Sequence, residues 1–315
     1  MAVDIRSERV RKLVAPDVEI EELGSGFSFG EGPIWNPEGA FLLFSDIAAS
    51  TRRRWDGRHG VVDVASATHN ANGMTLDADG RLLVCEHATS VVARMDPEGT
   101  GVGREVLASH YGDKELNSPN DIIVRSDGSI YFSDPPGGRS IPGLGIERDR
   151  ELNFNGVFRL RPSDFAVELI ADDFEVPNGL CFSPDESLLY IDDTVRCHIR
   201  CFEMRPDGSV GADRVFAEGI GRFDPVLTLK EGGVPDGMKC DERGNVWVTG
   251  PGGIWIFAPD GEHLGVVRTP KSLTNLHWGG PEWNWLFATA QTSLYRFRTK
   301  VSGRREPFMA RAARG

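Results

Sequence analysis

Six segments of the chain share one outline, and this repetition constrains the fold more than any other feature of the sequence. Each segment opens with an amide or carboxylate residue, continues into a short apolar strand, turns, and ends in a second apolar strand. The turns carry hairpin signals such as "DADG", "RSDG", "SPDE" and "DERG". The residues that open the segments, called the lead residues below, are Glu31, Asn72, Asn120, Asn178, Asp236 and Asn275.

The spacing of the lead residues indicates the architecture. They lie 41, 48, 58, 58 and 39 residues apart. Units of roughly 40–50 residues are typical of β-propeller blades, and unequal spacing fits one shared blade with loops of different length. Short strands dominate, and few segments show a helical apolar period. The sequence therefore predicts an all-β fold, a six-bladed β-propeller with four-stranded blades around a central channel.

The two ends of the repeat region predict how the ring closes. Val18–Gly24 alternates apolar and polar residues and has no hairpin partner in its own unit, whereas the last unit stops one strand short. Pairing these segments would remove an exposed sheet edge, so we expect Val18–Gly24 to complete the last blade. The predicted organisation of the 315 residues is an arm over 1–17, one propeller domain over 18–299 and a basic tail over 300–315.

Two further segments carry expectations of their own. The tail holds a group of basic residues and is expected to be a solvated end: Lys300, Arg304, Arg305, Arg311 and Arg314. The longest insertion, Pro135–Gly156, is rich in Gly, Pro and charged residues. Because a loop of this length in a compact domain is often a lid or a binding loop, we expect it to border the channel mouth and help to select the substrate.

Charge and composition exclude several classes of partner. A net charge of −12 disfavours nucleic acid, which needs a basic face. The first residues lack the apolar core of a signal peptide, and no run approaches the roughly 18 apolar residues of a membrane span. We therefore expect a cytoplasmic protein that does not span a membrane. The five scattered cysteines favour buried free thiols over a zinc site. The oligomeric state is left undetermined.

The lead residues carry the functional prediction. The innermost strand of each propeller blade runs beside the channel, so equivalent positions on different blades converge. Here they offer two carboxylates and four amide oxygens. Hard divalent cations prefer such ligands, and Ca²⁺ fits best, with Mg²⁺ and Mn²⁺ as alternatives. The competing interpretation is that Asn-Gly and Asp-Gly pairs begin turns for backbone reasons; Asn72 and Asn275 are the weakest members of the set.

The ordered segments resemble the senescence marker protein (regucalcin)/gluconolactonase family of six-bladed propellers, in its bacterial gluconolactonase-like branch. The resemblance covers about Gly26–Arg298 and rests on "GEGPIW", "NGMTLDADGRLLVCEH", "SPNDIIVRSDGSIYFSD", "PNGLCFSPDESLLYIDDT" and "PDGMKCDERGNVWV". It implies one catalytic divalent ion at one mouth of the channel, usually Ca²⁺, with Mg²⁺, Mn²⁺, Zn²⁺ and Fe²⁺ as further options.

The resemblance also implies roles for individual residues. Glu31, Asn178 and Asp236 match the family's metal ligands. Asn120 matches a residue that faces the substrate and, in related propellers, also the ion. Asp236 matches the residue assigned acid–base work. Asn120 is therefore an expected substrate contact, and Asn72 and His277 are added to it because of their positions on the inner strands. One position departs from the family, because Ser118 stands where animal members carry an Arg that contacts the sugar lactone. The lactone therefore need not be gluconolactone.

These residues predict a metal-dependent lactonase that hydrolyses the cyclic ester of a sugar lactone or similar small lactone to the hydroxy acid. Asp236 would accept a proton from the attacking water or attack the carbonyl itself, and both options stay open. A phosphotriesterase-like hydrolase needs the same parts and is the first alternative. A non-enzymatic calcium-binding propeller is the second. The sequence does not separate the two hydrolases, because both need a Lewis acid and an activated water, whereas the non-enzymatic alternative predicts a channel mouth with no open position on the ion.

Four other polar residues near the predicted strands have both a functional and a structural interpretation. His277 lies two residues after Asn275, on the same face of an inner strand, and either contacts substrate or is a buried structural histidine. For His87, which ends a second strand, the structural role is favoured. Asp192 and Asp193 either orient the ligands or close a strand-end turn.

Overall fold

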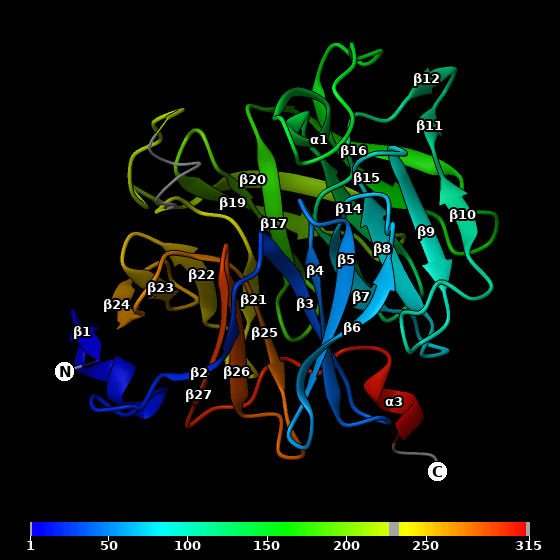
Figure 1. Ribbon diagram of the computed structural model, residues 1–315. Coiled ribbons are helices and arrows are strands. Elements are labelled where there is room, and N and C mark those ends of the chain that lie inside the picture. The colour runs from blue at the N-terminus through cyan, green and yellow to red at the C-terminus, as the bar shows by residue number, and fades with distance from the viewer. Residues whose placement is uncertain (1, 227–232, 313–315) are drawn as a thin grey trace.

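Six antiparallel sheets surround a central axis in the computed structural model, which describes residues 2–226 and 233–312 (Figure 1). The innermost strand of each sheet contacts the innermost strands of the sheets before and after it, and the last sheet returns to the first. This arrangement confirms the predicted six-bladed β-propeller. Each blade holds four strands in consecutive hairpin order, apart from the two ends of the chain.

The first three blades follow one another along the chain. Blade 1 consists of β3 (Gly30–Asn36), β4 (Phe41–Asp46), β5 (Thr51–Asp56) and β6 (Gly60–Ser66). Blade 2 consists of β7 (Ala71–Leu76), β8 (Leu82–Glu86), β9 (Val91–Met95) and β10 (Glu105–Ala108). Blade 3 consists of β13 (Ile122–Val124), β14 (Ile130–Asp134), β15 (Asn155–Leu160) and β16 (Val167–Phe174).

The remaining blades include both chain ends. Blade 4 consists of β17 (Pro177–Phe182), β18 (Leu188–Asp193), β19 (His198–Met204) and β20 (Val210–Glu218). Blade 5 consists of β21 (Met238–Cys240), β22 (Val246–Gly250), β23 (Gly253–Phe257), β24 (His263–Arg268) and β1 (Val3–Ile5). Blade 6 consists of β25 (Leu273–Gly279), β26 (Trp285–Ala290), β27 (Ser293–Arg298) and β2 (Glu21–Ser25).

Short elements connect the blades. A two-stranded hairpin, β11 (His110–Tyr111) with β12 (Lys114–Glu115), follows blade 2. The helical segments of the described chain are η1 (Glu8–Lys12), α1 (Gly137–Ser140) and α3 (Met309–Ala312). In Figure 1, α1 lies at the top of the view and α3 at the bottom. Over the described residues, no helix is long and apolar enough to cross a membrane.

The predicted closure of the ring is confirmed. β2 pairs antiparallel with β27, with Glu21 opposite Arg296 and Ser25 opposite Ser293. The amino-terminal strand thus forms the outer edge of the last blade and covers an edge that would otherwise be exposed. The pairing begins at Glu21, three residues after the start of the predicted segment. The residues before it do not hang free, because β1 pairs with β24 and adds a fifth strand to blade 5.

The expected solvated tail is wrong for its first half. Arg304 is only 6% exposed, and Val301 and Phe308 are also buried. The Arg304 guanidinium forms ion pairs with Glu186 and Glu306. The carbonyl of Arg304 accepts a hydrogen bond of 3.2 Å from the indole of Trp283. The described part of the tail therefore packs on the propeller through its buried apolar side chains and the ion pairs of Arg304. Arg314 and the side chain of Arg311 lie outside what the structure describes.

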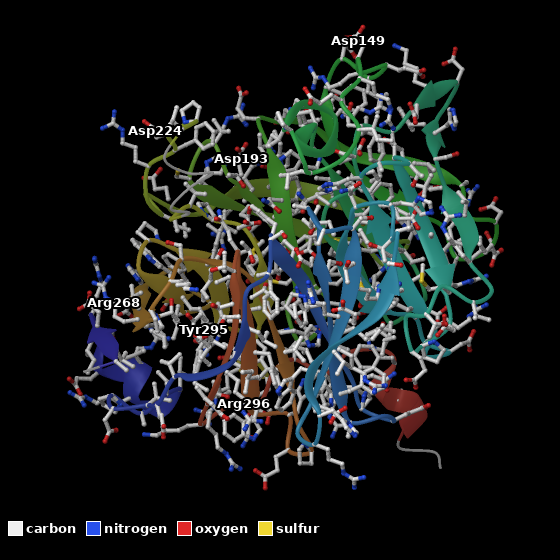
Figure 2. The ribbon with its side chains drawn as sticks, viewed as in Figure 1. Asp149, Asp193, Asp224, Arg268, Tyr295 and Arg296 are labelled. Atoms are coloured by element: carbon white, nitrogen blue, oxygen red, sulfur yellow. The ribbon has the colours of Figure 1, made fainter. Side chains whose placement is uncertain are left out.

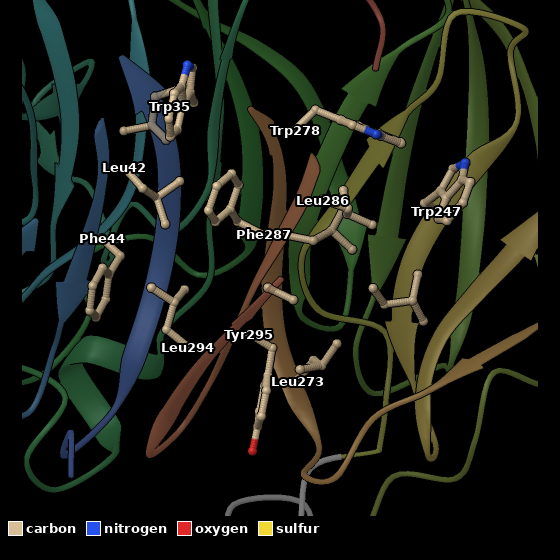
Figure 3. Packing of buried hydrophobic residues seen from close by; sticks show 14 of the residues in the cluster. Trp35, Leu42, Phe44, Trp247, Leu273, Trp278, Leu286, Phe287, Leu294 and Tyr295 are labelled. Carbon is tan, nitrogen blue, oxygen red and sulfur yellow. The ribbon is translucent and has the colours of Figure 1, made fainter. Parts of the chain in front are cut away.

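The hydrophobic core fills the spaces between neighbouring blades (Figure 3). Trp35 of blade 1 stacks on Phe287 of blade 6 with ring centroids 5.4 Å apart, and Trp247 of blade 5 meets Trp278 of blade 6 edge-on at 5.5 Å. The middle strands are buried on both faces, which explains why they read as apolar runs in the sequence. All five cysteines are free and buried within these layers, as expected.

Glycine follows the lead residue in four of the six units, and packing between blades supplies the reason. A Cβ atom on Gly179 would lie 2.1 Å from the carbonyl oxygen of Asp236, and one on Gly73 would lie 2.4 Å from that of Asn120. The same amides donate hydrogen bonds to these carbonyls, at 3.0 Å and 2.8 Å. Four lead residues, Asn72, Asn120, Asp236 and Asn275, thus rest against the glycine of the preceding blade. The glycines of the Asn-Gly and Asp-Gly pairs lack a positive φ, so packing between blades explains them better than a turn does.

Candidate active site

A cavity of about 340 Å³ opens where the inner strands begin, and five of the six lead residues line it. Strand irregularities set the direction of three of them. The pairing of the inner strand breaks register at Glu31, Asn72 and Asn178, and such bulges re-aim side chains at sheet ends. Asn120 and Asp236 lie just before β13 and β21. The convergence expected from the repeats is therefore present for these five residues.

Of the two carboxylates of the cavity, Glu31 is buried and Asp236 is partly exposed. Glu31 is 3% exposed, and its Oε2 accepts a hydrogen bond of 2.5 Å from the Gly32 amide. Burial, together with the charge of Asp121, raises the pKa of Glu31 to about 7. Burial and the charge of Glu31 raise the pKa of Asp236 as well. Two acidic groups this close disfavour each other's ionised form, and a cation between them would restore it.

Two amide side chains present an oxygen to the cavity that no described residue satisfies. The amide nitrogen of Asn178 donates to the Thr194 hydroxyl at 3.1 Å, and that hydroxyl donates to the Pro235 carbonyl at 2.9 Å. The Oδ1 atoms of Asn178 and Asn72 are buried and lack a hydrogen-bond partner within the described chain. Because a buried acceptor without a partner is costly, this geometry indicates a ligand for these oxygens.

His87 orients Asn72. Its Nε2 lies 3.1 Å from the Asn72 amide nitrogen, and its Nδ1 lies 2.8 Å from the carbonyl oxygen of Leu144. A neutral ring that donates from Nδ1 to the carbonyl can accept at Nε2 from the amide, and burial lowers the pKa of His87 to about 4, which keeps it neutral. The structural role favoured from the sequence fits this geometry. Nothing in the sequence predicted the contact between His87 and Asn72.

The other two predicted positions lie outside the cavity lining. Asn275 sits behind Glu31, to which it donates a hydrogen bond. His277 is buried against Trp283, with ring centroids 5.7 Å apart, and its Nδ1 lies 2.5 Å from the carbonyl oxygen of Trp278. Neither is among the described residues that line the cavity. The structure thus favours the structural reading of His277, and its assignment as a substrate contact gains no support.

Asp192 and Asp193 have separate roles. Asp193 closes the end of its strand, because its carboxylate accepts hydrogen bonds from the amides of Glu175, Val195 and Arg196. Asp192 is fully buried, and neither carboxylate oxygen has a partner in the described residues. Burial and the charges of Asp236 and Asp121 raise the pKa of Asp192. Asp193 therefore closes the strand-end turn, whereas Asp192 is a buried carboxyl group whose ionisation the charge of Asp236 disfavours.

The insertion and one neighbouring loop complete the cavity. Pro135, Ile141 and Leu144 line it from the insertion, and Phe223 and Pro225 line it from the loop after blade 4. Figure 2 shows Asp149 of the insertion and Asp224 of the loop at the same end of the molecule. The insertion therefore borders the channel mouth as expected. Ser118 does not reach the cavity lining, since its hydroxyl donates to the Pro135 carbonyl and accepts from the Gly138 amide.

The donor set of the cavity suits a hard divalent cation. Glu31 and Asp236 supply carboxylates, and Asn178 supplies a buried amide oxygen without a partner. Asn120 lines the same cavity. The described residues contain no cluster of three or more His, Cys, Asp or Glu side chains arranged for a metal. A site here would thus depend on amide oxygens beside two carboxylates, a mixture that Ca²⁺ accepts.

Comparison with known proteins places this cavity in a recognised context. Residues 29–292 match the family model described as the SMP-30/Gluconolactonase/LRE-like region. The gluconolactonase of Zymomonas mobilis is 34% identical over 94% of this chain and 86% of its own length. The pentonolactonase of Haloferax volcanii is 28% identical over 82% of this chain and 80% of its own. A solved structure of a gluconolactonase from Xanthomonas campestris is 32% identical, with a TM-score of 0.84 over 94% of each chain.

Proposed function

The chain belongs to the SMP-30/gluconolactonase/LRE-like family, and on that premise we propose that it is a metal-dependent lactonase that opens the cyclic ester of a sugar lactone or similar small lactone. Its relatives support a hydrolase that acts on lactone ester bonds. The observation that carries the metal dependence is the meeting of the Glu31 and Asp236 carboxylates with the buried, unpartnered amide oxygen of Asn178 in one cavity. In their ionised forms the two carboxylates repel each other, and a cation between them would relieve that repulsion.

Four residues would hold the ion: Glu31, Asn120, Asn178 and Asp236. When bound there, a divalent cation polarises a carbonyl and stabilises negative charge on its oxygen. The chain's own part is to fix the ligand atoms. Thr194 holds the Asn178 amide so that its oxygen faces inward, and Gly32 and Asn275 both donate to Oε2 of Glu31. Such contacts behind the ligands set their orientation.

Asp236 is the residue we assign to proton transfer. Its carboxylate lines the cavity, and among the described lining residues there is no Lys, Arg or Cys that could do the same work. In its ionised form it would take a proton from the water that attacks the lactone carbonyl and return it to the ring oxygen that leaves. His87 is a poor substitute, because both of its nitrogens are engaged by Asn72 and Leu144.

A substrate and metal panel tests the proposal. The protein is stripped with a chelator, its metal content is measured, and hydrolysis of δ-lactones and of an organophosphate triester is followed with and without added Ca²⁺. We expect lactone hydrolysis to disappear on stripping and to return with Ca²⁺ or another hard divalent cation. Full lactonase activity in a verified metal-free sample contradicts the metal dependence, and faster hydrolysis of the phosphotriester than of every lactone contradicts the substrate class.

A further inference from the structure

The cavity is divided into a polar floor and an apolar wall. The five lead residues form the floor, with Glu31 and Asp236 as the only charged residues lining it in the described chain. The apolar part of the lining, called the wall below, comes from segments far apart in the sequence and includes Phe29, Ile141, Leu144, Val176, Phe223 and Val234. No described Lys or Arg side chain lines the cavity. A ligand that fits must therefore be polar at one end and apolar at the other.

Most polar side chains beside the floor already have partners within the chain. The Thr274 hydroxyl donates to the Gly30 carbonyl at 2.6 Å, and the Ser140 hydroxyl to the Pro136 carbonyl at 3.0 Å. Thr194 and His87 are engaged as described above. A polyhydroxylated ring buries a hydroxyl at nearly every carbon, and each hydroxyl without a partner costs binding energy. Once the proposed metal ligands are set aside, Asn72 Oδ1 is the clearest hydrogen-bond acceptor that remains for a substrate hydroxyl.

The part of the wall that the insertion supplies is held in place before any ligand arrives. Arg139, which is 3% exposed, donates hydrogen bonds to the carbonyls of Leu116 at 2.6 Å and Asp149 at 2.7 Å. The Gly138 amide donates to Ser118, and the Leu144 carbonyl contacts His87. These contacts fix the insertion at both ends of the stretch that faces the cavity. A preformed apolar wall binds an apolar group without a further ordering cost.

We propose that the preferred substrate is a lactone whose ring carries an alkyl substituent, with the ester over the polar floor and the substituent against the wall of Ile141, Leu144, Val176, Phe223 and Val234. This inference rests on the proposed lactonase function and narrows its substrate class. Ile146 and Val226, which lie close to wall residues in sequence, are apolar side chains that are 56% and 61% exposed. A cavity of about 340 Å³ admits a substituted six-membered ring.

Three lactones with the same six-membered ring test the inference: glucono-δ-lactone, δ-valerolactone and δ-decalactone. Initial rates are measured at saturating Ca²⁺ and corrected for spontaneous opening. Because each buried methylene is worth about a fourfold gain in binding, we expect kcat/KM for δ-decalactone to exceed that for δ-valerolactone by about tenfold or more. Glucono-δ-lactone should be the poorest substrate. The corresponding δ-lactams, which resist hydrolysis, should bind in the same order in calorimetry.

Variants locate the effect. Leu144→Asn keeps the size of the side chain and the carbonyl that contacts His87, and Ile141→Thr is the second variant in case Leu144→Asn folds poorly. Each should lower the δ-decalactone to δ-valerolactone ratio by about fivefold or more, since a polar atom replaces part of the wall. Val102→Thr is the matched control, because Val102 is 71% exposed and lies outside the cavity lining; it should leave all rates unchanged.

The outcomes separate the two proposals. A higher kcat/KM for glucono-δ-lactone than for δ-decalactone overturns the substrate inference and leaves the lactonase function standing. An unchanged ratio in both wall variants also overturns it. Absence of metal-dependent hydrolysis for all three lactones, in a sample that binds Ca²⁺, instead overturns the lactonase proposal on which the inference rests.

Discussion

Asn275 donates a hydrogen bond of 3.0 Å from its amide nitrogen to Oε2 of Glu31, and this contact joins the last blade of the ring to the first. The amide oxygen of Asn275 is already engaged, since it accepts from the Leu276 amide at 2.8 Å. Asn275 therefore cannot serve as an oxygen ligand in this arrangement. It belongs to the row of lead residues, yet its role is to orient the carboxylate of another member.

The first prediction concerns this contact. Asn275→Ala should weaken Ca²⁺ binding by roughly 10–100-fold, because residues that orient a ligand contribute on that scale. Turnover at saturating Ca²⁺ should stay near that of the parent protein. Calorimetric titration of the metal-free protein measures the affinity. Asn36→Ala is the control. Asn36 is buried on the same strand as Glu31, but its side chain is hydrogen-bonded to Pro97 and Gly39 and not to Glu31. Equal losses of affinity in both variants would contradict the orienting role.

The second prediction separates the two carboxylates. Glu31→Gln keeps an oxygen but removes a charge, so its main loss should be metal affinity, and excess Ca²⁺ should recover much of the rate. Asp236→Asn also keeps an oxygen, but it can neither accept a proton nor attack the carbonyl. Its turnover rate at saturating Ca²⁺ should stay below that of the parent protein by about 10²–10⁴-fold or more. Turnover with metal occupancy checked directly decides the point. Recovery of Asp236→Asn with a persistent defect in Glu31→Gln would reverse the assignment.

The third prediction concerns pH. The pKa of Glu31 rises from its ordinary value of 4.5 to about 7 in the folded protein without metal, and that of Asp236 is also raised. Folding then binds protons, so this contribution to stability is complete below pH 4.5 and declines as the pH rises through about 7. Ca²⁺ favours the ionised carboxylates, so the rise in Tm on adding Ca²⁺ should be larger at pH 8 than at pH 5.

Thermal unfolding at both pH values, with chelator and with Ca²⁺, measures this difference. Ca²⁺ binding at pH 6 should also release protons, which calorimetry in two buffers of different ionisation enthalpy detects. Glu31→Gln removes one titrating group and should reduce the proton release. A Ca²⁺ shift in Tm that is the same at pH 5 and pH 8 would show that these carboxylates are already ionised without metal.

The fourth prediction concerns the glycine behind Asp236. Gly179→Ala should lower the free energy of unfolding of the metal-free protein by about 1–3 kcal/mol, because the added methyl group would overlap the Asp236 carbonyl oxygen. Gly57→Ala is the matched control, since nothing lies within 4 Å of a Cβ atom there, and its effect should be within about 0.5 kcal/mol. Urea unfolding measures both variants, and equal stability in the two would mean that the blades can separate without cost.

The sequence by itself was enough to predict the number of blades, the closure by the segment before the first unit and the meeting of Glu31, Asn72, Asn120, Asn178 and Asp236 in one cavity. These features follow from a local pattern repeated six times. Strand, turn and strand recur with a polar residue at the same point, and a closed ring brings such points to one axis whatever the lengths of the loops. The Asn-Gly and Asp-Gly pairs could equally mark turns, and tertiary contacts such as that between Gly179 and the Asp236 carbonyl were needed to show that the glycines serve packing between blades.

Tertiary structure alone decided what each of these residues offers to the cavity. The amide oxygens of Asn72 and Asn178 face the cavity because their amide nitrogens are hydrogen-bonded to His87 and Thr194. Asn275 does not line the cavity, and its amide nitrogen donates to Glu31. The apolar wall joins residues of the insertion to Phe223 and Val234, which lie about 80 or more positions along the chain. The direction of an amide and the makeup of a wall depend on contacts between blades, and such contacts leave no period or spacing in the sequence from which to predict them.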